Sequence, residues 1–119
     1  MTSSKKTRGP RKAPRRWPPS AKELDALIAD AIVDAYGDLE QRGGFLAMID
    51  EHLEMPFEVQ ILGNAATLEQ VEMFDDQIVA ICRNGRFQQA IPILELALPA
   101  PRPKGVEWIE AYRRWMRGG

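Results

Sequence analysis

At 119 residues, of which 45% are hydrophobic, the chain is long enough to form one domain around a modest core. It has no apolar run near the roughly 18 residues of a membrane-spanning helix, and no apolar segment follows the basic N-terminus as in a secretory signal. The single cysteine, Cys82, excludes an intramolecular disulfide and is typical of a reducing cytoplasm. We therefore expect a cytoplasmic monomer that does not contact membranes.

The formal net charge of −1 conceals a segregated distribution of charge along the chain. Residues 1–19 hold seven Lys and Arg and no acid, whereas the stretch from Glu23 to Asp76 holds fourteen acids against one base, Arg42. One base minus fourteen acids gives this stretch a net charge of −13 over 54 residues. Such an excess repels itself unless the carboxylates are solvated, paired with the basic ends of the chain, or neutralised by cations.

The basic, proline-rich residues 1–19 predict a disordered arm that precedes a single domain at 20–119. The seven bases could bind nucleic acid or an acidic partner through the release of counterions, with Trp17 as the one stacking group. The same composition also suits a solubilising tail that folds back loosely on the acidic body. The sequence leaves both interpretations open.

Two helices are predicted at the start of the domain. Ser20 and Glu23 have the Ser-x-x-Glu spacing of a capping box, and apolar residues then recur at helical spacing to about Tyr36. Gly43–Gly44 predict a break between the two helices. A second helix is predicted from Phe45 to about Glu54, where a proline follows.

Short strands are predicted from residue 57 onward. Apolar and polar residues alternate over 57–61, as expected for a strand with one buried face. The alternation is less clean over 67–74, and a β-branched run suited to a central strand follows at 77–83.

A hairpin and a final helix complete the predicted fold. Asn84-Gly85 is a strong hairpin signal before a partner strand at 86–94, in which Pro92 indicates an edge or a bulge. Residues 105–116 predict a closing helix, because aromatic and aliphatic residues recur in them at helical spacing. Two helices, about four antiparallel strands and a last helix make a small α+β domain.

The closing helix carries an aromatic stripe beside several arginines. Trp108, Tyr112 and Trp115 could stack on the bases of a single-stranded nucleic acid. Their spacing of four and then three residues also describes an ordinary helix stripe that packs on a sheet. We favour packing in the core.

Enzyme chemistry is poorly supported by the sequence. A nucleophilic pair of Cys82 and His52 would need the two side chains to meet beside a third, orienting group, and Cys82 lies in an apolar strand. The chain also lacks a glycine-rich phosphate loop and the Cys and His spacings of a zinc site. We therefore expect a protein that is not an enzyme.

Asp30, Asp34 and Asp38 recur every four residues on the first predicted helix, with no base among them. Like charges at this spacing cost about 0.2–0.5 kcal/mol per pair, and acids near a helix C-terminus oppose the dipole by about 0.3–1 kcal/mol each. A solvated surface tolerates such costs, but the carboxylates could equally be placed for a cation. The local pattern leaves both interpretations open.

Ca²⁺ is the cation that suits this composition. It takes about six to eight oxygen ligands, which the acidic stretch has in excess, although the chain has no EF-hand loop. A site must therefore be assembled from separate segments. The candidate ligands are Asp34, Asp38 and Glu40 at the end of the first helix, Glu58 on the outer face of the first strand, and Asp75–Asp76 in the turn before the central strand.

The segments MPFEVQILG, IVAICRNGRFQQAIPILELALP and GVEWIEAYRRW, preceded by DAYGDLEQ, resemble a small bacterial family of calcium-binding proteins first described in cyanobacteria. The resemblance covers about residues 22–117. It implies an α+β fold with two N-terminal helices, a small, barrel-like antiparallel sheet of about four to five strands, and a C-terminal helix. It also implies that Ca²⁺ binds at an acidic surface. Carried over to the matching motifs, the metal ligands are Asp34, Asp38, Glu40, Glu58 and Asp75.

We therefore expect a non-enzymatic protein that buffers or senses calcium. Its sites should have dissociation constants on the order of 10⁻⁵ M or weaker, because no preorganised loop collects the carboxylates. The alternative is an interaction module whose basic arm, residues 1–19, contacts nucleic acid or an acidic partner.

Overall fold

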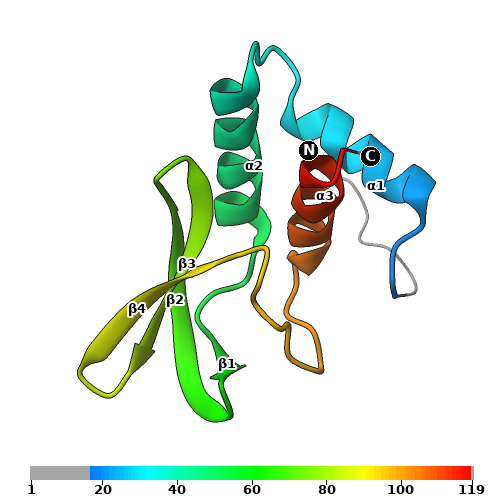
Figure 1. Ribbon diagram of the computed structural model, residues 1–119. Helices are drawn as coiled ribbons and strands as arrows, with labels where there is room; N and C mark the ends of the chain where they lie inside the picture. Colours follow the sequence, from blue (N-terminus) through cyan, green and yellow to red (C-terminus); the bar gives the residue numbers. More distant parts are fainter. Residues whose placement is uncertain (1–16, 119) are drawn as a thin grey trace, which may run out of the picture.

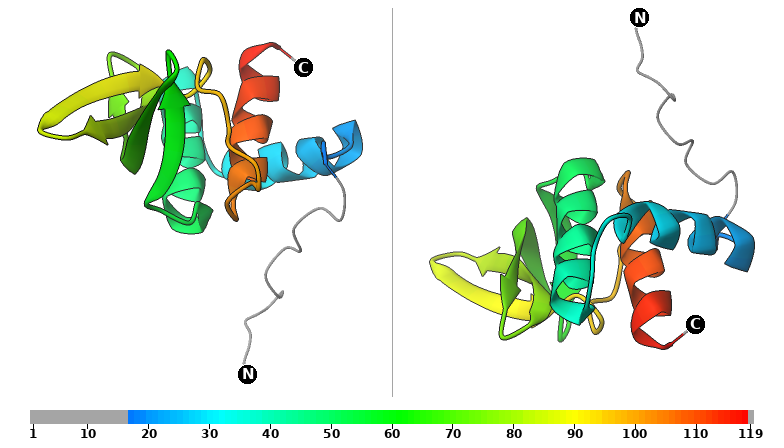
Figure 2. Two further views of the ribbon diagram at one scale, coloured as in Figure 1. Left: turned by 90° about the horizontal axis from the view of Figure 1, so that it is seen from below. Right: turned by 90° about the horizontal axis from the view of Figure 1, so that it is seen from above.

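The computed structural model describes residues 17–118, which form three helices and one four-stranded sheet (Figure 1). The α+β class is as predicted, with two helices before the sheet and one after it. Helix α2 lies between the sheet and the other two helices (Figures 1 and 2). In chain order the elements are α1 (Ala21–Ala31), α2 (Asp38–His52), β1 (Phe57–Ile61), β2 (Asn64–Phe74), β3 (Gln77–Asn84), β4 (Phe87–Pro92) and α3 (Val106–Met116).

The sheet is antiparallel and open, in the order β1-β2-β3-β4, so β1 and β4 are its edge strands. The register shifts between Leu68 and Gln70, where β2 bulges against β3. This bulge explains the imperfect alternation over 67–74, because Leu68 and Val71 are both buried although three positions separate them. In the described part of the chain the sheet has four strands, and the fifth strand of the expected range is not formed.

The predicted β3–β4 hairpin is present, but its turn lies one residue further along. Asn84 pairs with Phe87, so Gly85 and Arg86 form the turn. Gly85 adopts a φ of 63°, in the left-handed region that favours glycine, whereas Asn84 is the last residue of β3. Pro92 is the last residue of β4, on an edge strand as its missing N–H requires.

The structure differs from the prediction at the junction of the first two helices. Helix α1 ends at Ala31 and not near Tyr36, and α2 begins at Asp38 and continues through Gly43–Gly44. A Cβ atom on Gly44 would collide with the carbonyl oxygen of Ala31. Gly44 therefore allows α1 and α2 to approach closely, and the glycine pair does not break the helix.

The chain before α1 is fixed at two points. The predicted capping box is confirmed: Ser20 Oγ accepts from the Glu23 N–H at 3.1 Å, and the Glu23 carboxylate accepts from the Ser20 N–H at 2.8 Å. Trp17 is half-buried against the core, with the Arg102 guanidinium 4.4 Å from its ring centroid. Of the predicted arm at 1–19, residues 1–16 lie outside the described residues.

The core forms between the inner face of the sheet, α2 and α3. Trp108 is 3% exposed and Tyr112 is fully buried, so the aromatic stripe of α3 packs in the core, as we favoured, and offers no open stacking platform. The largest fully buried side chains are Tyr112, Phe45, Ile49, Leu68, Ile78, Ile93, Ile109, Val59 and Cys82.

Candidate functional site

The connection between α1 and α2 and the first turn of α2 carry three of the predicted ligands. Asp34 lies in the connection with a φ of 61°, and Asp38 and Glu40 lie in the first turn of α2. All three are exposed, and the Glu40 carboxylate accepts a hydrogen bond from the Tyr36 N–H at 2.7 Å. These acids are therefore free to contact solvent or ions at one corner of the molecule.

The helix dipole acts on Asp38 and Glu40 in the direction opposite to the prediction. Asp38 and Glu40 lie at the N-terminus of α2, where the dipole stabilises negative charge. Asp30 belongs to α1 and Asp34 to the connection, so the row of three aspartates does not lie on one helix. The cost expected for Asp38 is thus absent, whereas Asp30 still lies in the last turn of α1, where the dipole opposes its charge.

The β2–β3 turn supplies Asp75 and a further acid, Asp76. Both are exposed and have left-handed φ values of 54° and 63°. Arg42 Nη1, from α2, donates a hydrogen bond to the carbonyl oxygen of Asp76. Since Arg42 follows Asp38 by one helical turn, this bond places the β2–β3 turn beside the first half of α2.

Glu58 lies apart from the other predicted ligands. It pairs with Thr67 on β2, seven residues before Phe74, and a strand rises about 3.3 Å per residue, so about 23 Å of strand separates it from the β2–β3 turn. Glu58 also lines a shallow depression of about 260 Å³ together with Arg83. The Arg83 guanidinium pairs with Glu69 at 3.0 Å, and it opposes the binding of a cation within this depression, which lies on the β2 side of Glu58.

The predicted ligands do not form one preorganised centre. Among residues 17–118, no group of three or more His, Cys, Asp or Glu side chains is placed to hold a metal ion. A Ca²⁺ ion takes about six to eight oxygens, so an ion bound here needs water or main-chain carbonyls in addition to the carboxylates. The arrangement suits loose, hydrated binding and not a closed cage.

Cys82 and His52 both pack against other residues of the protein. Cys82 is 1% exposed on β3, and burial, aided by the negative charge of Glu69, raises the pKa of its thiol. A nucleophilic thiol requires a lowered pKa and access to substrate, so Cys82 has neither property. The His52 ring stacks on Trp108, with centroids 5.1 Å apart, at the C-terminal end of α2.

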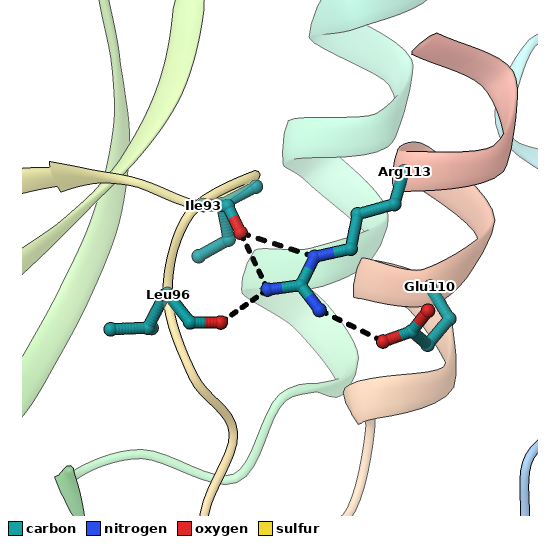
Figure 3. A network of polar contacts seen from close by, with 4 residues as sticks. All are labelled: Ile93, Leu96, Glu110 and Arg113. Carbon is teal, nitrogen blue, oxygen red and sulfur yellow. Dashed lines mark hydrogen bonds and ion pairs between the residues drawn. The ribbon is translucent and has the colours of Figure 1, made fainter. Parts of the chain in front are cut away.

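The arginines of α3 hold the fold together. Arg113 donates from Nε and Nη2 to the carbonyl oxygen of Ile93, at 3.2 and 2.8 Å, and from Nη2 to that of Leu96 (Figure 3). Its Nη1 bonds Glu110 at 2.9 Å, and the neighbouring Arg114 pairs with Asp25 of α1 at 2.8 Å. Both guanidiniums are therefore engaged within the protein.

Sequence reasoning missed a groove on the free side of β1. It has a volume of about 550 Å³ and lies between β1 and the segment that joins β4 to α3. The proline-rich composition of 99–103 was a usable signal, because prolines cannot continue a sheet and so leave a strand edge open. The residues that line the groove are Phe57, Glu58, Val59, Gln60, Ala97, Leu98, Pro99, Ala100, Pro101 and Pro103.

Comparison with known proteins gives no relative from which to transfer a function. No family model, curated protein or solved structure matches the chain. The resemblance to the calcium-binding family stays a prediction from the sequence motifs. Within the described residues, no helix is both long and apolar enough to cross a membrane.

Proposed function

We propose that this chain binds Ca²⁺ as a weak buffer or sensor, through carboxylates gathered at one end of the molecule. The proposal follows the resemblance to the bacterial calcium-binding family, and it retains four of the five ligands that the resemblance implies. We call this group the acidic end; it consists of Asp34, Asp38, Glu40, Asp75 and Asp76.

The observation that carries the proposal is the hydrogen bond between Arg42 and the carbonyl oxygen of Asp76. It ties the β2–β3 turn to α2, so acids that are far apart in sequence share one region of the surface. Five carboxylates minus one guanidinium, that of Arg42, leave this region a net charge of −4. Such a surface concentrates cations, and exposed carboxylate oxygens are the ligands that Ca²⁺ prefers.

The open arrangement sets the expected affinity. Because no three carboxylates of the described residues are close enough to form a metal site, a bound ion keeps part of its water shell. We expect dissociation constants on the order of 10⁻⁵ M or weaker. Mg²⁺ requires near-octahedral geometry and dehydrates reluctantly, so this surface should favour Ca²⁺ over Mg²⁺.

Isothermal titration calorimetry of the full chain tests the proposal. CaCl₂ should give a saturable heat, and MgCl₂ at the same ionic strength should give a much weaker one. The double variant Asp34→Asn, Asp38→Asn should bind Ca²⁺ at least about tenfold more weakly, which corresponds to about 1.4 kcal/mol.

The matched control is Asp50→Asn, Glu51→Gln, which removes two exposed charges from the C-terminal half of α2. It should leave Ca²⁺ affinity within about twofold of the parent, a difference smaller than about 0.5 kcal/mol. Equal loss in both double variants would mean that Ca²⁺ responds only to overall charge. No heat at millimolar Ca²⁺ would remove the proposed function altogether.

A further inference from the structure

The groove beside β1 is built from a strand edge and an apolar wall. Its floor is β1, and the opposite wall is the segment between β4 and α3, which Figure 1 draws in orange. Arg102 is not among the lining residues and lies over the Trp17 ring instead. The groove belongs to neither the acidic end nor the Arg113 network.

The register of β1 shows which main-chain groups face the groove. The two-residue turn Leu62–Gly63, with φ values of 51° and 81°, closes the pair Ile61 and Asn64. In an antiparallel ladder, hydrogen-bonded and non-hydrogen-bonded pairs alternate, so Glu58 and Gln60 point their N–H and C=O groups away from β2. Because β1 is an edge strand, these four groups face the groove.

The opposite wall leaves this edge unpaired. It contains Pro99, Pro101 and Pro103, which have no N–H to donate to a sheet ladder. Between β1 and residues 97–103, both within the described chain, no main-chain hydrogen bond is formed. The prolines therefore explain why this segment does not form a fifth strand. Together with Leu98 they provide an apolar surface opposite β1, which the side chains of another extended chain could contact.

Glu58 gives the groove a charge preference. Its side chain is exposed, it has no ion-pair partner within residues 17–118, and its cross-strand neighbour on β2 is the neutral Thr67. A residue of an added strand that lies opposite Glu58 would be its second cross-strand neighbour. Opposite charges in such pairs are favourable and like charges are unfavourable.

We propose that this groove binds an extended, basic peptide segment of a partner protein, which adds to β1 as a fifth strand. The N–H and C=O groups of Glu58 and Gln60 pair with the peptide main chain, as in other cases of strand addition. A Lys or Arg of the peptide lies opposite the Glu58 carboxylate, and apolar side chains of the peptide contact Leu98 and the prolines. The proposal is independent of calcium.

The test uses the full chain, in the presence of a calcium chelator, and a capped peptide of sequence Val-Lys-Val-Lys-Val-Lys as the probe. Binding is followed by fluorescence anisotropy of the labelled peptide and by amide chemical shifts of the ¹⁵N-labelled protein. We expect the shifts to concentrate at residues 57–61 and 97–103. N-methylation of alternate peptide residues, in the register that faces β1, should weaken binding at least about tenfold, because it removes the pairing N–H groups.

Charge variants test the role of Glu58. Glu58→Lys should reverse the preference, so that a Val-Glu-Val-Glu-Val-Glu peptide binds better than the lysine peptide. The control Glu51→Gln, an exposed acid on α2, should leave both affinities unchanged. Folding of each variant is checked by circular dichroism.

Three results would overturn the proposal. The first is no binding of the lysine peptide at millimolar concentration. The second is evidence of attraction by charge alone: either binding that survives N-methylation in both registers, or chemical-shift changes located at the acidic end. The third is a concentration-dependent shift of residues 57–61 without peptide, which would assign the edge to a second copy of this chain.

Discussion

Among residues 17–118, the buried hydroxyl of Tyr112 has no hydrogen-bond partner. Tyr112 is fully buried, and within the described part of the chain its hydroxyl oxygen has no partner. Its ring packs against Phe45 and Trp115, with centroids 5.5 and 6.2 Å apart. A buried polar group left unpaired costs about 1–3 kcal/mol, whereas the ring contributes through packing.

Tyr112→Phe should therefore stabilise the protein. The substitution keeps the ring contacts and removes the unpaired hydroxyl, so the free energy of unfolding should rise by about 1 kcal/mol. Urea denaturation measures this change, and the control is Tyr36→Phe at a side chain that is 80% exposed, where no change is expected. A clear loss of stability in Tyr112→Phe would mean that the hydroxyl makes a stabilising hydrogen bond in solution.

At the scale of elements, two adjacent glycines in α2 have opposite roles. A Cβ on Gly44 would collide with the main chain at Ala31, where α1 ends, whereas a Cβ on Gly43 would meet nothing within 4 Å. Both lie inside a helix, where alanine is favoured over glycine by about 0.8–1 kcal/mol. Only Gly44 is therefore needed for the contact between the two helices.

The same substitution at the two sites should have effects of opposite sign. Gly43→Ala should raise the free energy of unfolding by about 0.5–1 kcal/mol. Gly44→Ala should lower it by about 1–3 kcal/mol, since main-chain atoms of α1 must move. Thermal or urea unfolding of both variants measures the difference. If Gly44→Ala is as stable as Gly43→Ala, α1 and α2 do not pack as closely as the structure places them.

The two glycines also show which features of the helices and strands could be predicted from the sequence and which could not. Strand β1 and helix α3 were predictable from their own residues, because apolar residues recur every second position in β1 and at helical spacing in α3. Gly44 resembled a helix breaker, because its role is set by Ala31, a contact between elements that no local pattern records. The turn at Gly85–Arg86 was misplaced by one residue for a similar reason, since strand pairing fixes which residues remain for the turn.

The candidate site was predictable in composition but not in layout. The acids were expected at the surface, and Asp34, Asp38 and Glu40 are exposed there. The separation of Glu58 depends on the direction in which β2 runs away from β1. The contact of Arg42 with the β2–β3 turn depends on how α2 packs on the sheet. Neither arrangement follows from residues near one another in the sequence.

For the molecule as a whole, the acidic stretch from Glu23 to Asp76 is only partly balanced by the basic C-terminal part. Among the described residues, Arg114–Asp25 at 2.8 Å and Arg83–Glu69 at 3.0 Å join acids of this stretch to bases that follow it. Partly exposed pairs of this kind contribute about 0.2–1 kcal/mol each. Within residues 17–118, these two pairs leave most of the net charge of −13 without a direct ion pair, so carboxylates of the acidic stretch repel one another there.

Salt should stabilise the protein by screening this repulsion, and calcium should add a separate effect. Raising NaCl from about 0.01 to 1 M shortens the screening length from about 30 to 3 Å, so the thermal midpoint should rise.

At a concentration 100 times its dissociation constant, a ligand that binds only the folded state adds about 2.7 kcal/mol. With a dissociation constant near 10⁻⁵ M, millimolar Ca²⁺ should therefore exceed NaCl of equal ionic strength by about this amount. The Asp34→Asn, Asp38→Asn variant should lose about half of the calcium increment or more, because a dissociation constant ten times higher leaves millimolar Ca²⁺ at only about ten times that constant. It should keep the response to NaCl, because only a few of the repelling charges are removed. Equal responses to the two salts in the parent chain would assign the whole effect to screening of an acidic surface.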